Sequence, residues 1–283
     1  MTPLVVTAVL TAALTHATWN AIAHRIEDKL VAFTLISGGA TVLGAVIACF
    51  VPLPLAAAWP YLLVSALLHV GYMVLLMRSF TLGDFGQMYP IARGTAPLVV
   101  TVVAVALVGE SMDAWQTAGV VVTSTGLVGL ALWGIRDARA TPRWPALLAA
   151  LATGVSIAAY TVVDGVGVRN AGSSLSYIAW LLILEGILIP AYALYARRGR
   201  LLPQLRPHAA RGLLGAALST LAYGLVLWAQ TRAPLGPVSA LRESSILVGA
   251  VIGAVFFKER FGTPRIVAAG LMVVGIGLML HAS

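Results

Sequence analysis

Long apolar stretches dominate the chain, and short clusters of polar and charged residues separate them. Seven windows between Leu4 and Leu280 hold roughly 17 or more consecutive uncharged, mostly apolar residues, the length that a helix needs to cross about 30 Å of hydrocarbon. Three further windows carry one or two charges. The pattern predicts ten membrane-spanning helices at residues 3–22, 30–52, 58–79, 85–108, 114–135, 144–166, 175–196, 208–230, 236–257 and 264–281.

Composition supports the same fold class. Hydrophobic residues make up 60% of the 283 residues and charged residues only 10%, whereas an ordinary soluble domain has a charged fraction of about 25%. We therefore expect an all-α polytopic membrane protein with little mass outside the lipid bilayer.

The basic residues are distributed unevenly between the loops. The net charge is +8, and fourteen of the 18 Lys and Arg residues lie in loops that follow odd-numbered spans. The opposite side has only Arg169 and Arg232. The positive-inside rule then places the odd loops in the cytoplasm and both chain ends outside. The charge is accounted for by topology, so no nucleic-acid partner is expected.

The chain repeats itself at an offset of 149 residues, which places Arg93 on Arg242 and Glu110 on Glu259. The offset divides the chain into residues 1–138 and 139–283, each with five predicted helices. Because five is odd, two tandem copies must enter the membrane in opposite orientations. The sequence thus predicts two inverted five-helix repeats, an architecture typical of secondary transporters with a site near the midplane.

Two segments also carry a family resemblance. Residues 89–97 lead to Gly109 and Glu110, and residues 234–243 lead to the Phe257–Arg260 cluster. Both resemble the paired EamA domains of the drug/metabolite transporter superfamily, and the resemblance covers nearly the whole chain. It implies a ten-helix basket around a central cavity and transport of small polar metabolites, often by export. It also implies cytoplasmic chain ends, and on this point we keep the orientation predicted from the charges.

Two arginines inside apolar stretches are the first candidates for substrate binding. A charged group at the centre of a membrane helix costs at least about 2.5–3.5 kcal/mol, so such groups usually face the bundle interior and serve a function. Arg93 and Arg242 occupy matching places, each near two prolines. A guanidinium suits a carboxylate or phosphate, and Arg93→Ala is then expected to abolish binding with little loss of stability. The alternative for Arg242 is a structural ion pair or a cap on a broken helix.

Three carboxylates fall within predicted spans and are candidates for proton coupling: Asp164, Glu185 and Glu243. The alternative is that each belongs to a buried ion pair between helices. Glu243 follows Arg242 directly, about 100° further round a helix, so we expect it to contact a different helix.

Histidines and aromatic residues complete the predicted site. His16 and His69 could donate to substrate or carry protons. Ring faces for a planar or cationic metabolite are expected from Trp19, Tyr72, Tyr89 and Tyr160. Hydrogen bonding between helices and core packing are the alternatives. Glu110 and Glu259 are expected to be structural and to cap or tie the following helix.

These features predict a secondary-active exporter of a small polar metabolite, such as an amino acid, in the cell (inner) membrane. The resemblance suggests export by proton exchange, a facilitator is the alternative that the residues leave open, and the expected transport mechanism is alternating access. The alternative is a flippase for a lipid-linked or phosphate-bearing amphiphile, because arginines also suit phosphate. No hydrolase or phosphate-loop motif occurs, so neither an enzyme, a cofactor nor a metal is expected. The protein is predicted to be a monomer or a homodimer.

Overall fold

The computed structural model describes residues 1–82, 93, 96–137, 144–249, 251 and 263–281. It is 87% helical, and these residues include no strand. The long helices are α1 (Pro3–His24), α2 (Lys29–Ala48), α3 (Trp59–Leu82), α5 (Ala96–Val103), α6 (Ala114–Asp137), α7 (Trp144–Arg169), α8 (Ser174–Gly186), α9 (Leu188–Arg197), α11 (Ala209–Gln230), α12 (Leu235–Arg242) and α14 (Thr263–His281). Short turns are η1 (Ala56–Ala58), η2 (Ala104–Val108), α10 (Leu201–Leu205) and η3 (Arg206–His208).

The predicted class, an all-α polytopic membrane protein, is confirmed. Within the described ranges, six segments are long and apolar enough to cross a membrane: Pro3–Ala23, Lys29–Ala48, Ala56–Leu76, Leu147–Arg169, Ser174–Arg197 and Leu201–Gln230. The predicted spans 85–108 and 236–257 lie partly outside the described residues. The count of ten spans therefore stays a prediction.

Local side chains explain where several helices begin. Asp28 caps α2, because its Oδ1 accepts hydrogen bonds from the backbone N–H groups of Leu30 and Val31 at 3.0 and 3.2 Å. Thr2 caps α1 by accepting from Val5 N, and Ser173 caps α8 by accepting from Ser176 N. Each cap satisfies backbone donors that have no partner inside the helix.

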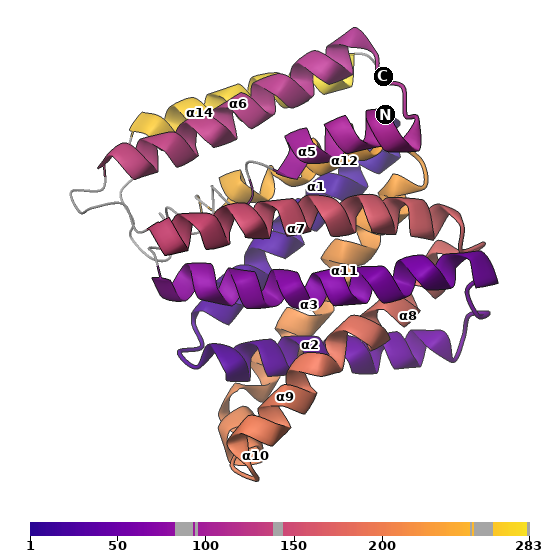
Figure 1. Ribbon diagram of the computed structural model, residues 1–283, viewed down its shortest axis with the longest axis vertical. Helices are drawn as coiled ribbons and strands as arrows, with labels where there is room; N and C mark the ends of the chain where they lie inside the picture. Colours follow the sequence, from indigo (N-terminus) through magenta and orange to yellow (C-terminus); the bar gives the residue numbers. More distant parts are fainter. Residues whose placement is uncertain (83–92, 94–95, 138–143, 250, 252–262, 282–283) are drawn as a thin grey trace.

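The span predicted at 175–196 is interrupted, because α8 ends at Gly186 and α9 starts at Leu188. Pro190 explains the interruption. Proline has no N–H to donate to the carbonyl of Gly186, and its ring collides with that carbonyl in a straight helix. The change in direction between α8 and α9 is visible in Figure 1.

A second interruption lies within the span predicted at 236–257. Helix α12 ends at Arg242, and Glu243 and Ser244 form a turn. Ile246 N then donates to Glu243 O at 2.9 Å, and Leu247 N donates to Ser244 O at 3.0 Å. These bonds join residues three apart, the tighter 3₁₀ pattern that often marks a functional or strained point in a helix.

Helices from the two halves of the chain pack against each other (Figure 1). The contacting pairs are α1 with α11, α3 with α7, α2 with α8, α5 with α12 and α6 with α14. Each pair joins a helix from residues 1–138 to one from residues 139–283. The two halves therefore interleave, and the interior is built from both.

Small residues allow one of these pairs to approach closely. A Cβ atom added to Gly119 of α6 would lie 2.5 Å from the carbonyl oxygen of Gly275 of α14, and one added to Gly275 would lie 2.7 Å from that of Gly119. Such backbone contact is typical of small-residue interfaces in membranes. These two glycines therefore serve packing within the chain.

Candidate functional site

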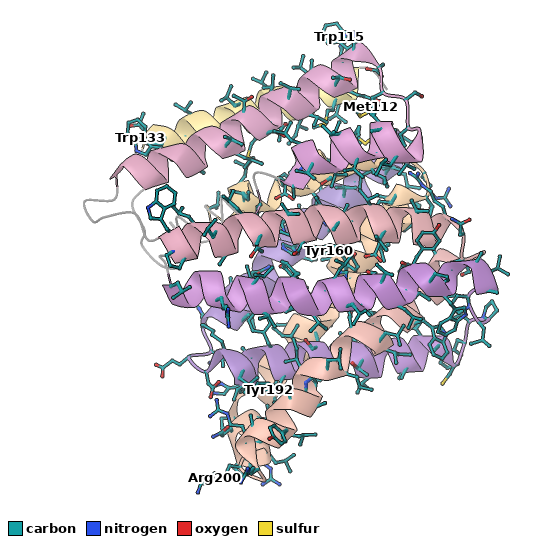
Figure 2. The ribbon with its side chains drawn as sticks, in the orientation of Figure 1. Met112, Trp115, Trp133, Tyr160, Tyr192 and Arg200 are labelled. Atoms are coloured by element: carbon teal, nitrogen blue, oxygen red, sulfur yellow. The ribbon has the colours of Figure 1, made fainter. Side chains whose placement is uncertain are left out.

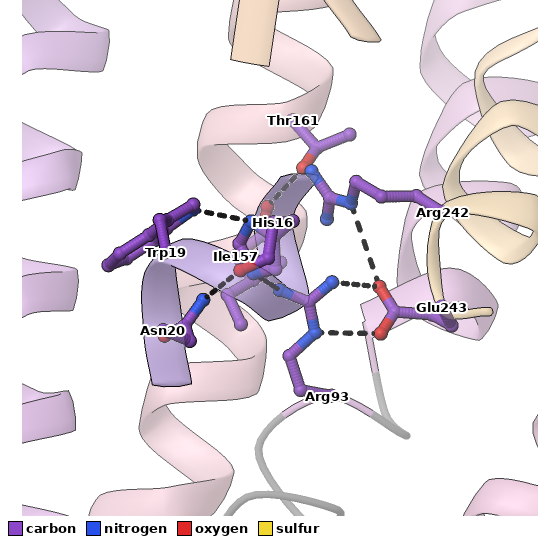
Figure 3. Close-up of polar contacts among 8 residues, drawn as sticks. All are labelled: His16, Trp19, Asn20, Arg93, Ile157, Thr161, Arg242 and Glu243. Carbon is purple, nitrogen blue, oxygen red and sulfur yellow. Dashed lines mark hydrogen bonds and ion pairs between the residues drawn. The ribbon is translucent and has the colours of Figure 1, made fainter. Parts of the chain in front are cut away.

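A buried ion pair joins two residues that are 150 positions apart (Figure 3). Arg93 Nε donates to Glu243 Oε2 at 2.7 Å, and Arg93 Nη2 donates to Glu243 Oε1 at 3.0 Å. The two side chains are only 3% and 0% exposed. The contact is bidentate, the strongest geometry for a guanidinium and a carboxylate. Glu243 thus contacts another segment of the chain, as predicted.

The expectation that Glu243 is turned away from Arg242 is wrong. Arg242 Nε lies 3.6 Å from Glu243 Oε1. The 100° argument assumes a continuous helix, and α12 ends at Arg242, so the turn at Glu243 brings the two side chains together. The distance is too long for a hydrogen bond.

The cluster of Arg93, Arg242 and Glu243 has an unequal charge count. Two guanidinium groups share one carboxylate, so the three side chains together carry one surplus positive charge. The Nε and Nη2 atoms of Arg242 are buried and have no hydrogen-bond partner in the described part of the chain. Unsatisfied buried donors are costly, so this guanidinium is suited to receive an acceptor from a ligand.

Helix α1 brings His16 to the same cluster. His16 Nε2 lies 3.1 Å from Arg93 Nη1, and His16 Nδ1 lies 3.3 Å from Trp19 Nε1. Both neighbours are hydrogen-bond donors, whereas a neutral imidazole has one acceptor nitrogen. The ring can therefore satisfy one of them at a time. Asn20, one turn along, donates to the backbone carbonyl of His16 at 2.9 Å.

A second polar cluster is formed by α3, α7, α8 and α11. Asp164 is fully buried and accepts hydrogen bonds from the hydroxyl groups of Tyr177, at 2.8 Å, and Tyr223. His69 Nδ1 lies 3.1 Å from Ser65 Oγ, and His69 Nε2 lies 3.4 Å from Glu185 Oε2. Two predicted carboxylates and one predicted histidine are thereby brought together.

Tyr160 of α7 lies near the middle of the helix assembly (Figure 2). Its ring stacks on His69 with centroids 4.0 Å apart and makes an edge contact with Tyr72 at 5.5 Å. It also makes an edge contact with Tyr223 at 6.2 Å. Tyr160 therefore belongs to the second cluster.

The structure thus divides the predicted site residues into two groups. The first contains His16, Trp19, Arg93, Arg242 and Glu243, and the second contains His69, Tyr72, Tyr160, Asp164 and Glu185. Tyr89 and Glu259 lie outside the described residues.

The sequence analysis missed Ser65 and Tyr177. Ser65 precedes His69 by one helical turn, so the i, i+4 spacing of two polar residues within an apolar span was a usable signal. Tyr177 gave no such signal, because its distance to Asp164 depends on how α7 and α8 pack.

Glu110 has a structural role at one end of the helices. Its Oε2 accepts a hydrogen bond from Leu235 N at 2.7 Å, and its Oε1 lies 2.7 Å from Arg169 Nη1. Arg169 also donates to the carbonyl oxygens of Gln230 and Ala233, at 2.8 and 3.1 Å. Glu110 therefore ties α12 of the other half, whereas the prediction was the following helix, α6.

Comparisons with known proteins identify the family. Residues 144–281 match the EamA-like transporter family. This chain carries an EamA domain. The resemblance seen in the sequence is confirmed over residues 144–281, and this family suggests that the EamA protein is a membrane transporter of the drug/metabolite type.

Two further comparisons add the fold alone. A solved structure titled "Crystal structure of protein" is similar to 98% of this chain and 98% of its own, with a TM-score of 0.71 and 18% sequence identity. The low identity means that this likeness supports a shared fold over the whole EamA protein and no shared substrate. No curated protein matches the sequence.

Proposed function

We propose that this EamA protein is a secondary-active exporter in the cell (inner) membrane and that its substrate is a small polar metabolite with a carboxylate, such as an amino acid. The observation that carries the proposal is the surplus positive charge at Arg242, whose Nε and Nη2 atoms have no acceptor among the described residues. A carboxylate would supply the acceptors and neutralise the charge.

The neighbouring residues suit the rest of such a molecule. His16 of α1 contacts Arg93, and Trp19 lies on the other side of the His16 ring; we propose that Trp19 and Tyr160 complete the site. Aromatic faces attract an ammonium group, so a zwitterion can be held at both ends. We propose Tyr72 and Tyr89 as further contacts. Arg93 contributes by holding Glu243, and with it the local charge, in place.

Helix pairing supports the proposed inverted repeat of ten spans, with halves at residues 1–138 and 139–283. Exchanging the halves, helix by helix, maps the pair α1–α11 onto α7–α3. The pairs α2–α8 and α6–α14 map onto themselves, and α5–α12 joins the predicted spans 85–108 and 236–257, which also exchange with each other. A two-fold arrangement produces this pattern, and inverted repeats of this kind support alternating access around a site near the midplane. The family match to residues 144–281 agrees with the proposed boundary.

A thermal-shift screen tests the substrate class. Purified protein is melted with amino acids, nucleobases, sugar phosphates, organic cations and short-chain lipid phosphates. A ligand that binds only the folded state at 100 times its Kd stabilises it by about 2.7 kcal/mol. We expect amino acids to raise the melting temperature of the wild type and of the Arg200→Ala control, whose side chain is exposed (Figure 2). Arg242→Met is expected to remove the shift.

Other results would overturn specific parts of the proposal. A shift produced by organic cations alone would exclude the carboxylate substrate. A shift produced by lipid phosphates alone would favour the flippase. An undiminished amino-acid shift in Arg242→Met would remove Arg242 from the site. Uptake of the active ligand into inside-out vesicles then tests export, since an exporter accumulates it there.

A further inference from the structure

The second polar cluster contains more acid groups than basic ones. Asp164 and Glu185 are its carboxyl groups, and His69 is its single basic side chain. Tyr177 and Tyr223 supply hydroxyl groups from α8 and α11. Of the described residues that hydrogen-bond or pair with these acids, none is Lys or Arg. A buried charge without a counter-ion is strongly disfavoured, so protons are expected to balance the cluster.

The hydrogen bonds indicate where a proton is held. Asp164 accepts hydrogen bonds from the hydroxyl groups of Tyr177 and Tyr223. His69 Nδ1 lies 3.0 Å from the backbone carbonyl oxygen of Ser65, which can only accept, so Nδ1 must carry a proton. Its other nitrogen, Nε2, lies 3.4 Å from Glu185 Oε2. With the ring proton on Nδ1, both Nε2 and the carboxylate oxygen are acceptors and cannot hydrogen-bond each other. One further proton between these two atoms makes a hydrogen bond.

His69 and Glu185 are in direct contact, and Tyr223 links them to Asp164, because its hydroxyl donates to Asp164 and its ring lies against His69 with centroids 5.4 Å apart. The Asp164 residue is 0% exposed, whereas the Glu185 side chain is 20% exposed. Glu185 is therefore the more exposed of the two carboxyl groups, and Asp164 is the inner one. A proton that reaches Glu185 can pass to His69 Nε2 and return the same way.

We propose that His69 and Glu185, with Ser65 orienting the His69 ring, form a proton-binding site that loads and releases the coupling ion of this transporter. The coupling role of this site rests on the proposed function, since a bound proton drives transport only if the protein moves a substrate. The site is separate from the arginine cluster, and one proton is bound and released at His69–Glu185 in each cycle.

Tyr160 is the candidate connection between the proton site and the arginine cluster. Its ring stacks on His69 at 4.0 Å and packs edge-on against Tyr72 and Tyr223, and it lies on α7 near the middle of the helix assembly. We propose that a change of charge at His69–Glu185 is transmitted to the substrate site by movement of this ring and of α7. Such differential interaction with two ligands is what coupling requires.

The first test detects the proton without any substrate. Infrared spectra of the purified protein are recorded over a pH titration without substrate, and the spectra of each variant are subtracted from those of the wild type, so that groups common to both cancel. We expect carboxyl or imidazole bands that titrate in the wild type and are lost in Glu185→Gln and in His69→Gln. Glu27→Gln, a change at an exposed carboxylate, is the matched control and should retain them. Unchanged bands in both site variants would overturn the proposal.

The second test measures coupling in proteoliposomes with a mixture of ¹⁴C-labelled amino acids. Exchange of one proton across a gradient of one pH unit should accumulate the label about tenfold. Glu185→Gln is expected to lose this accumulation and to keep counterflow at equal pH, which shows that it is folded. Wild-type accumulation by Glu185→Gln would overturn the proposal. If the wild type transports none of the mixture, the proposed substrate class fails, and the infrared comparison decides the proton site alone.

Discussion

Glu243→Gln is expected to destabilise this EamA protein much more than Arg242→Met. Glutamine keeps the volume of Glu243 and leaves two guanidinium groups buried without a counter-ion. Removing one partner of a buried ion pair costs about 3–5 kcal/mol. Arg242→Met removes the surplus charge and leaves the bidentate pair of Arg93 and Glu243, at 2.7 and 3.0 Å, electrically neutral. Methionine fills the space of the arginine stem, so the loss in the free energy of unfolding should stay below about 1.5 kcal/mol.

Equilibrium unfolding in mixed detergent micelles, without ligand, measures this difference. A gap of about 2 kcal/mol corresponds to roughly a 30-fold change in the unfolding constant. A double variant of Arg93→Gln with Glu243→Gln should recover part of the loss, because it removes both members of the pair. Equal destabilisation by Arg242→Met and Glu243→Gln would refute the reasoning and make Arg242 a structural ion-pair partner.

The ion pair also revises the expectation for Arg93→Ala. The sequence argument treats Arg93 as a substrate contact whose loss leaves stability nearly normal. In the structure, its removal leaves the buried carboxylate of Glu243 with Arg242 alone, at 3.6 Å. We now expect Arg93→Ala to lower both stability and binding, so Arg242 is the better residue for testing substrate contact.

Two further predictions concern packing. Glu110→Ala should lower the free energy of unfolding by about 1–3 kcal/mol, because it leaves Leu235 N without its hydrogen-bond acceptor and Arg169 without its carboxylate. If Arg169→Ala, added to Glu110→Ala, lowers the free energy of unfolding by the same amount again, the two side chains do not act together and the prediction is wrong. Gly275→Ala should lower the melting temperature, because the added Cβ would meet α6 at less than van der Waals distance. The control Gly277→Ala has no atom within 4 Å of the added Cβ and should be neutral or slightly stabilising. Equal melting temperatures of the two variants would contradict the close contact.

Local sequence was enough for most helix positions. Predicted spans such as 3–22 and 208–230 agree closely with Pro3–His24 and Ala209–Gln230. The hydropathy of a segment depends only on the residues of that segment, so a membrane span can be predicted without knowing which helices pack against it. The break at Ile187 was also readable in principle, since Pro190 disrupts a helix whatever surrounds it. The prolines near Arg242 made a broken helix an alternative in the sequence, but neither proline nor glycine stands at the turn itself, so its place at Glu243 was not readable.

The sequence by itself determined that this protein lies in a membrane, that it is helical, and that Arg93, Arg242, Asp164, Glu185 and Glu243 need partners inside it. The cost of burying each charge makes that conclusion independent of the fold. Only the tertiary structure decided who the partners are. Arg93 meets a carboxylate 150 residues away, and His69 meets Glu185 from another helix. Hydrogen bonds and ion pairs depend on distances of about 3–4 Å between helices, and the packing of the two interleaved halves sets those distances.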